Sequence, residues 1–245
     1  MREARRRVIA FLPPRLLASL PLPVYVSPVP IRSSFRFIAV ALVVACGGGS
    51  TPPAPAPATP LPPPPPQEPV VAFLSAPFAG QAVAVTPLTL LVSADNIGTM
   101  APLADHAAAL AWADSLLGAT LLARAPEVKW VLPPELRKIA RRAPTVAPDP
   151  DRMGQSVLRG KSMATVPDPL RSALRSLVAL TGGRCALVPA ALSFVPDATG
   201  PVRAELNLVF VDARTGQVLW RTVTWAVGAT PSQALLKAIE IVLPV

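Results

Sequence analysis

Residues 202–227 read VRAELNLVFVDARTGQVLWRTVTWAV, and this stretch decides the fold. Its first half alternates, as a strand with one buried face should. The apolar positions that would face the core are Val202, Ala204, Leu206, Leu208 and Phe210, and the polar positions between them are Arg203, Glu205 and Asn207. Arg214-Thr215-Gly216 then turns the chain, since Gly216 can take a positive φ, and residues 217–227 return as the partner strand. The sequence therefore predicts an antiparallel hairpin.

The segments around this hairpin predict further strands and helices. Residues 184–195 are nearly all apolar, as in a central strand covered on both faces. Residues 82–93 predict a buried strand in which Pro87 marks an edge, a bulge or the strand's end. The remaining periodic segments predict a helix over 102–124, a short strand over 128–133, a helix opened by Pro134 and a closing helix over 232–243.

Three helix starts share one signature, in which a capping residue precedes proline at the first helical position: Asp149-Pro150, Asp168-Pro169 and Thr230-Pro231. The predicted fold class is α/β, a mixed sheet of about five strands packed with helices. Its order is strand, helix, strand, helix, helix, strand, strand, strand, helix. We expect a single α/β domain over residues 70–245.

Three stretches carry a resemblance to a known kind of domain. They are VAVTPLTL (83–90), ALVPAALSF (186–194) and AELNLVFVDARTGQVLW (204–220). Together they resemble the CsgG/TolB amino-terminal type of bacterial envelope domain, which includes LpoB-like periplasmic domains. This resemblance implies the fold but does not select a role, because its members include secretion-pore lipoproteins, activators of cell-wall synthases and translocation-associated proteins.

The amino-terminal region predicts a lipid anchor. Residues 37–45, FIAVALVVA, follow the basic residues Arg32 and Arg36 and are too short to span a bilayer as a helix. Val43-Val44-Ala45-Cys46 resembles the lipobox of bacterial lipoproteins, which implies cleavage after Ala45 and thioether lipidation of Cys46. Residues 1–45 are therefore predicted to be a signal peptide. The Gly at position 47 favours, by the same resemblance, the periplasmic face of the outer membrane.

Residues 1–30 fit a signal peptide poorly, because prolines interrupt their apolar text. One alternative is a translation start nearer residue 29, which would leave residues 1–30 untranslated. The other is a twin-arginine signal at Arg6-Arg7.

Residues 46–69 form a Gly/Pro-rich spacer after the predicted lipidation site. Residues 51–69, TPPAPAPATPLPPPPPQEP, favour polyproline II, because proline fixes φ and lacks an amide donor. At about 3.1 Å per residue this stretch would reach roughly 60 Å. We expect a stalk, and the alternative is a ligand for a proline-binding module.

The net charge of +9 does not indicate nucleic-acid binding. Seven of the 23 basic residues and one of the 14 acidic residues lie in residues 1–45, which leaves a net charge of +3 from Cys46 onward. Such a weak positive balance is not the footprint of a nucleic-acid-binding protein.

One basic stripe is the best candidate binding surface. Arg137, Lys138, Arg141 and Arg142 lie along one side of a predicted helix. They could meet anionic lipid headgroups, cell-wall polymer or an acidic partner, or they could be a solvated face.

Other candidate sites are rejected, and no catalytic residue, metal or cofactor is predicted. GQSVLRGKS (154–162) has five residues between Gly154 and Gly160-Lys161, where a phosphate-binding loop needs four. The single histidine, His106, has no partners at a readable spacing, and a helix-face or surface position is expected for it. Asp149 and Asp151 could suggest paired carboxylates, but helix capping explains Asp149. Cys185 is expected to be a small core residue.

These features predict a non-enzymatic, lipid-anchored periplasmic accessory or assembly protein that binds another envelope component. The first alternative is a homo-oligomeric outer-membrane secretion component, which would need a long amphipathic hairpin to enter the membrane. The second is an envelope hydrolase, which would need a pocket lined by Asp or Glu with a raised pKa.

Overall fold

The computed structural model describes residues 69–160 and 163–243. The predicted signal peptide, the lipidation site Cys46 and the spacer up to residue 68 lie outside the described residues.

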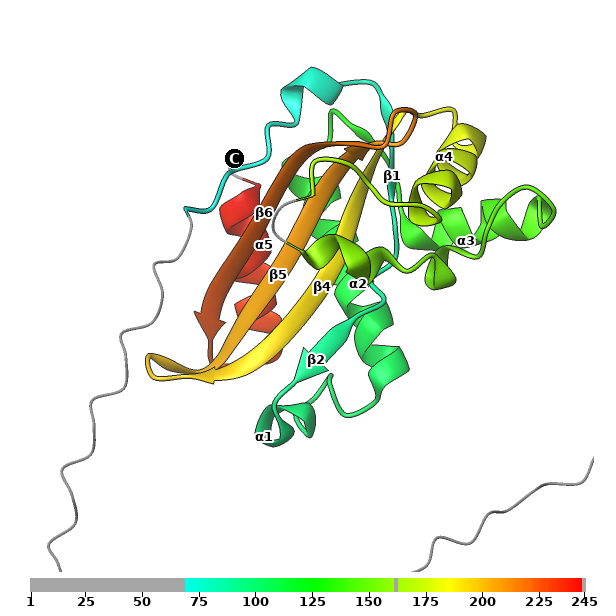
Figure 1. Cartoon of the computed structure of the whole chain (residues 1–245). Coiled ribbons are helices and arrows are strands. Elements are labelled where there is room, and N and C mark those ends of the chain that lie inside the picture. Colours follow the sequence, from blue (N-terminus) through cyan, green and yellow to red (C-terminus); the bar gives the residue numbers. More distant parts are fainter. Residues whose placement is uncertain (1–68, 161–162, 244–245) are drawn as a thin grey trace, which may run out of the picture. The chain divides into compact units, whose positions relative to one another are not determined.

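The fold is mixed α/β, as predicted, and its centre is a six-stranded sheet in the order β3-β1-β4-β5-β6, with β2 also paired to β4 (Figure 1). The predicted hairpin is β5 (Gly200–Asp212) with β6 (Gln217–Gly228). Gly216 ends its turn with a φ of 79°. β4 (Cys185–Asp197) lies antiparallel to β5 and is almost wholly buried in its first half, as a central strand should be. The predicted succession of three strands, β4, β5 and β6, is therefore confirmed.

The predicted strand over 82–93 is two strands, which raises the count from about five to six. β1 (Ala82–Val85) and β2 (Leu91–Ser93) both run parallel to β4, β1 beside Cys185 and β2 beside Leu192. β1 also pairs in parallel with β3 (Lys129–Val131) on its other side. The chain leaves the ladder between β1 and β2, where Pro87 has no amide to donate.

Helices cover both faces of the sheet and make two cores. On one face α2 (His106–Arg124) and α5 (Pro231–Val242) pack over the apolar side of β5 predicted from its alternation. On the other face α3 (Pro133–Arg142), α4 (Leu170–Leu180) and the 3₁₀ turn η3 (Gln155–Arg159) cover the start of β4 and the end of β5. Three short turns complete the described chain: η1 (Ala76–Phe78), α1 (Asp95–Gly98) and η2 (Pro150–Arg152).

The helix starts behave differently from one another. Thr230 caps α5 as predicted, because its Oγ1 accepts from the Gln233 amide at 3.3 Å. Asp149 caps only the single turn η2, so no helix follows it. α4 begins one residue after Pro169, and Asp168 accepts instead from the Ser172 hydroxyl.

Within residues 69–160 and 163–243, one helix, α2, is long and apolar enough to cross a bilayer by length and composition. Its buried side chains belong to the core shared with α5 and the sheet. It therefore reads as a core helix of this fold.

Candidate functional site

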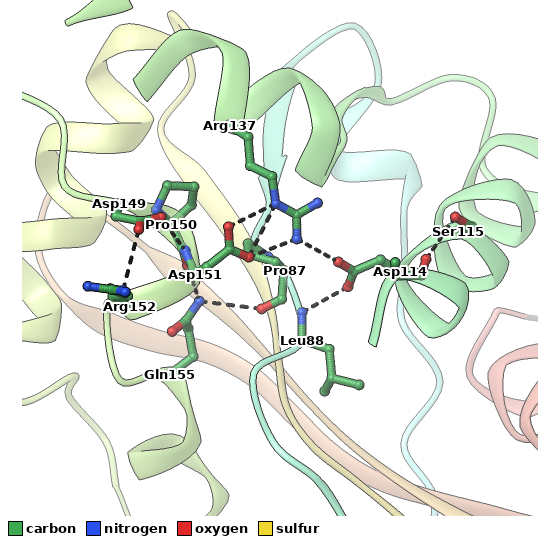
Figure 2. A network of polar contacts seen from close by, with 11 residues as sticks. Pro87, Leu88, Asp114, Ser115, Arg137, Asp149, Pro150, Asp151, Arg152 and Gln155 are labelled. Carbon is green, nitrogen blue, oxygen red and sulfur yellow. Dashed lines mark hydrogen bonds and ion pairs between the residues drawn. The ribbon is translucent and has the colours of Figure 1, made fainter. Parts of the chain in front are cut away.

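The basic stripe predicted on α3 is divided by an ion-pair network around Arg137 (Figure 2). The Arg137 guanidinium donates from Nε and Nη2 to the Asp151 carboxylate at 2.8–3.2 Å, and its Nη2 also donates to Asp114 Oδ2 at 3.2 Å. Asp114 lies on α2 and is 6% exposed. Arg137 therefore links α3 to α2 and to η2.

The same network holds the break between β1 and β2. Asp114 Oδ1 accepts from the Leu88 amide at 2.8 Å, and the buried Gln155 side chain donates to the carbonyls of Pro87 and Pro150 at 3.3 and 2.6 Å (Figure 2). Backbone groups that leave the ladder beside Pro87 thus find side-chain partners. The network therefore satisfies backbone groups beside Pro87, in the segment between β1 and β2.

A hydrolase would need an acid with a raised pKa in a substrate pocket. Asp114 has the raised pKa but not the pocket. Burial raises its pKa from 3.8 to about 6, against the opposing effects of the Leu88 amide and Arg137. The adjoining cavity, however, has a volume of about 10 Å³ and is otherwise lined by apolar side chains and Pro189. That volume admits at most about one water molecule. A substrate therefore has no room beside this carboxyl group.

The remaining stripe residues are exposed on α3. Lys138 lies 3.9 Å from Glu135 in a solvent-exposed pair, and Arg141 and Arg142 point from the last turn of the helix. These two cations complement the carboxyl end of the helix dipole. Anion or partner binding by the stripe of residues 137–142 stays a prediction.

The other residues singled out from the sequence take structural positions. His106 is exposed at the first position of α2, and Cys185 is buried with its pKa raised by burial. Asp149 accepts from the Asp151 amide, while the Asp151 carboxylate pairs with Arg137, so the two acids do not form a catalytic pair. Across residues 69–160 and 163–243, no group of three or more His, Cys, Asp or Glu side chains could hold a metal ion.

An open face at the far end of the sheet was not predicted from the sequence. Beyond Asn207, whose amide donates to the Arg159 carbonyl, no described helix covers β4–β6 on the side of α3 and α4 (Figure 1). Paired rows of side chains occupy this area, and we call it the open sheet face: Val92, Ser193, Glu205 and Trp225 in one row, and Val195, Arg203 and Val227 in the next.

The open sheet face is apolar and electrically balanced. Val92 is 54% exposed and Val195 is 39% exposed, while Trp225 and Val227 are half-buried. The Arg203 guanidinium carbon lies 4.4 Å from the centre of the Trp225 ring. Arg203 also lies within 4 Å of Glu205 and Asp197, so its charge is offset. The alternation of β6 carried a signal for this face, since Val223, Trp225 and Val227 are all apolar on its second side.

A second missed feature is a basic hollow at the opposite end of β4. Its volume is about 300 Å³. Its walls come from α4, from the start of β4 and from the β5–β6 turn: Arg175, Val178, Ala179, Gly183, Arg184, Ala213 and Arg214. The three arginines lie in separate segments of the sequence, so no local motif predicts that they share one hollow.

Comparison with known proteins gives low-similarity likenesses. No family model matches the chain, and no curated protein matches it. The LpoB C-terminal domain from Salmonella enterica is 13% identical with a TM-score of 0.37, covering 61% of this chain and 84% of that chain. The NMR structure of E. coli LpoB is 17% identical with a TM-score of 0.36, covering 84% and 93%. A PelC dodecamer from Paraburkholderia phytofirmans is 16% identical with a TM-score of 0.32, covering 72% and 92%.

With identities below 20% and TM-scores below 0.5, these likenesses transfer no role to this chain. LpoB-like periplasmic domains are among those named by the sequence resemblance, and two of these structures are LpoB. The CsgG/TolB assignment and the lipid anchor remain predictions.

Proposed function

We propose that this chain is a lipid-anchored accessory protein of the bacterial envelope that binds another envelope protein through the open sheet face. The observation that carries the proposal is the apolar surface that the exposed Val92 and Val195 form with the half-buried Trp225 and Val227. Contiguous apolar surface of this kind marks a protein interaction site, and Trp and Arg are the residues most often found at binding hot spots.

The chemistry of the face indicates the chemistry of the partner. Its charged residues, Arg203 and Glu205, offset one another, and the neighbouring Asp197 adds a single negative charge, so no strong net charge selects a polyanion or a polycation. A folded protein surface with an apolar centre and a polar rim suits such a face. β6 is also the last strand of the sheet, and among the described residues its outer edge is paired only at its start, through residues 164–166.

The proposed location of the protein in the cell is argued from the sequence. Cys46 in its lipobox-like context supports thioether lipidation, and Gly47 supports the periplasmic face of the outer membrane. Several acyl chains anchor a protein stably, because each buried CH₂ contributes about 0.8 kcal/mol. Labelled fatty acid should be incorporated into the protein, and Cys46→Ser should abolish the label and move the protein out of the membrane fraction.

The binding face can be tested with a photo-crosslinking residue in intact cells. Placed at Val195 or Val227, it should join the chain to one heterologous envelope protein. Placed at Leu122, which is 50% exposed on α2, it should not. Trp225→Ala should reduce the crosslink from Val195, while Leu122→Ala leaves it unchanged.

The outcomes separate the alternatives. A crosslink to a second copy of the chain would favour the homo-oligomeric secretion component. Equal crosslinking from Val195 and Leu122 would remove the open sheet face as the site. The hydrolase alternative gains no support from the described residues, because the cavity beside Asp114 is too small for a substrate.

A further inference from the structure

The basic hollow combines positive charge with a fixed shape. Arg175 comes from α4, Arg184 from the residue before β4, and Arg214 from the β5–β6 turn. Arg171, one helical turn before Arg175, also reaches this turn, because its side chain packs within van der Waals range of Gly216. Three arginines therefore line the hollow, and the Arg171 side chain lies beside the turn that carries Arg214.

One buried acid, Asp212, fixes the position of Arg184 and of the β5–β6 turn. It offsets only one of the positive charges of the hollow. Asp212 is 3% exposed and accepts from Arg184 Nε and Nη2 at 2.8 and 2.6 Å, and from the amides of Arg214 and Thr215. Although burial acts to raise the pKa of Asp212, these hydrogen bonds hold it below its usual value. Asp212 therefore stays ionised and fixes Arg184 and the turn that carries Arg214.

The remaining cations have no acidic partner among the described residues. Arg175 and Arg214 are exposed and belong to none of the ion pairs of residues 69–160 and 163–243. Asp168, at the opposite end of α4, is bonded to Ser172. The carboxyl end of α4 favours one nearby cation. Its last carbonyls already accept from the amides of Thr181 and Gly182, so the helix end does not account for all the arginines.

We propose that the basic hollow of Arg175, Arg184 and Arg214 binds a phosphate-bearing anion. Arginine presents a planar fork of donors that matches phosphate oxygens, and a volume of about 300 Å³ lies at the small end of ligand sites. Gly183 lines the hollow without a side chain. The ligand is either a small soluble phosphate compound or the headgroup of an anionic lipid, and both present the same oxygens. This site is separate from the open sheet face, and the proposal does not depend on the proposed function.

The test uses the full-length chain carrying Cys46→Ser, so that no attached lipid contributes to binding. Calorimetric titration with pyrophosphate probes the soluble source. Sedimentation with vesicles of phosphatidylcholine, with or without phosphatidylglycerol, probes the headgroup source. The measured quantity is the difference between the parent chain and each variant in their preference for the anionic vesicles, which cancels the contribution of the basic and apolar residues 1–45.

Arg175→Gln with Arg214→Gln is the informative double variant, because both residues are exposed and Arg184 keeps its bond to Asp212. It should weaken pyrophosphate binding about tenfold or more, since hydrogen bonds to charged groups are the strong ones. Arg152→Gln with Arg159→Gln removes the same charge from the exposed side chains of η2 and η3 and should change binding less than about twofold. Unchanged thermal unfolding would show that both variants remain folded.

Each outcome decides the proposal. Loss of pyrophosphate binding in the hollow variant alone supports a soluble phosphate ligand, and loss of the vesicle preference in that variant alone supports a headgroup. If neither probe binds the parent chain, or if both double variants lose binding equally, the hollow is not a phosphate site.

Discussion

At the scale of single residues, Asp114 is an acid that burial makes costly to ionise. Its carboxyl group is buried on α2, where water is replaced by protein, and its pKa rises from 3.8 to about 6. A folded-state pKa above the unfolded value means that the folded protein prefers the protonated acid. The stabilising effect of this group is complete below about pH 4 and is lost as the pH rises through about 6.

Asp114→Asn should therefore gain stability relative to the parent chain as the pH rises. Asn keeps an oxygen to accept from the Leu88 amide and cannot ionise. A shift of about two pKa units corresponds to about 3 kcal/mol at most. Urea unfolding followed by tryptophan fluorescence at pH 4.5 and 7.5 measures the change.

Asp197→Asn is the matched control for Asp114→Asn. Hydrogen bonds from Thr199 lower the pKa of Asp197, so its effect lies below pH 4 and outside this range. If the difference between Asp114→Asn and the parent chain does not change with pH, Asp114 does not titrate in this range.

Gly183 shows a second constraint at this scale. A methyl group added there would lie 2.4 Å from the Ala82 carbonyl oxygen of β1, which is backbone and cannot move aside. Gly183→Ala should cost about 2 kcal/mol in the free energy of unfolding.

The neighbouring glycine provides the comparison. Gly182 has a φ of 71° and open space around it, so Gly182→Ala should cost only about 1 kcal/mol of backbone strain. Denaturant titration of both variants checks the order, and a larger loss for Gly182→Ala would contradict the close approach of β1 to Gly183.

At the scale of elements, Arg137 holds α3 in place. Removing its side chain would leave Asp114 buried without its cation and would free the Asp151 turn. Breaking one partner of a buried ion pair is costly, and Arg137→Ala should lose about 2 kcal/mol of stability.

Lys138→Ala is the neighbouring control, because Lys138 makes only a long, exposed contact with Glu135. It should change stability by less than about 0.5 kcal/mol. Thermal unfolding compares the two variants. Equal losses would mean that Arg137 acts as a surface cation, as the undivided stripe implied.

The elements themselves could be predicted because their signals are local. Alternation in 202–213 and the Gly216 turn identified β5 and β6, and helical spacing identified α2, α3 and α5. The split of residues 82–93 was harder, because the Leu88 amide leaves the ladder for a carboxylate 26 positions away. Asp149-Pro150 matched a helix start but was followed by only one 3₁₀ turn.

The candidate sites were less predictable for the same reason. Arg137 looked like one member of a surface stripe, and its partners Asp114 and Asp151 become neighbours only when α2, α3 and η2 pack together. The basic hollow likewise joins arginines from three separate segments. A single sequence shows charge along one helix face, but it does not show which acid from another element meets it.

At the scale of the whole molecule, the two proposed binding surfaces lie at opposite ends of the sheet. The open sheet face lies on the late half of β4, and the basic hollow lies at the start of the same strand. One central strand thus connects the proposed protein-binding area with the cationic area. An envelope adaptor can use the first for its partner and the second for an anionic ligand without competition between them.

The spacer determines how far the open sheet face can reach from a lipid anchor. Residues 51–69 are dominated by proline, and polyproline II would extend them to roughly 60 Å. A Gly/Ser chain of the same length would have a typical end-to-end distance of only about 25 Å.

Replacing residues 51–68 with Gly/Ser should therefore reduce the crosslink from Val195 to the partner severalfold in cells. A scrambled spacer that keeps every proline should retain it, because stiffness depends on composition and not on order. Fatty-acid labelling at Cys46 and the unfolding temperature should match the parent chain in both variants, which separates reach from anchoring and folding. If the Gly/Ser spacer crosslinks as well as the proline spacer, the partner lies close to the membrane. If scrambling alone abolishes the crosslink, the proline segment is itself a ligand for a proline-binding module.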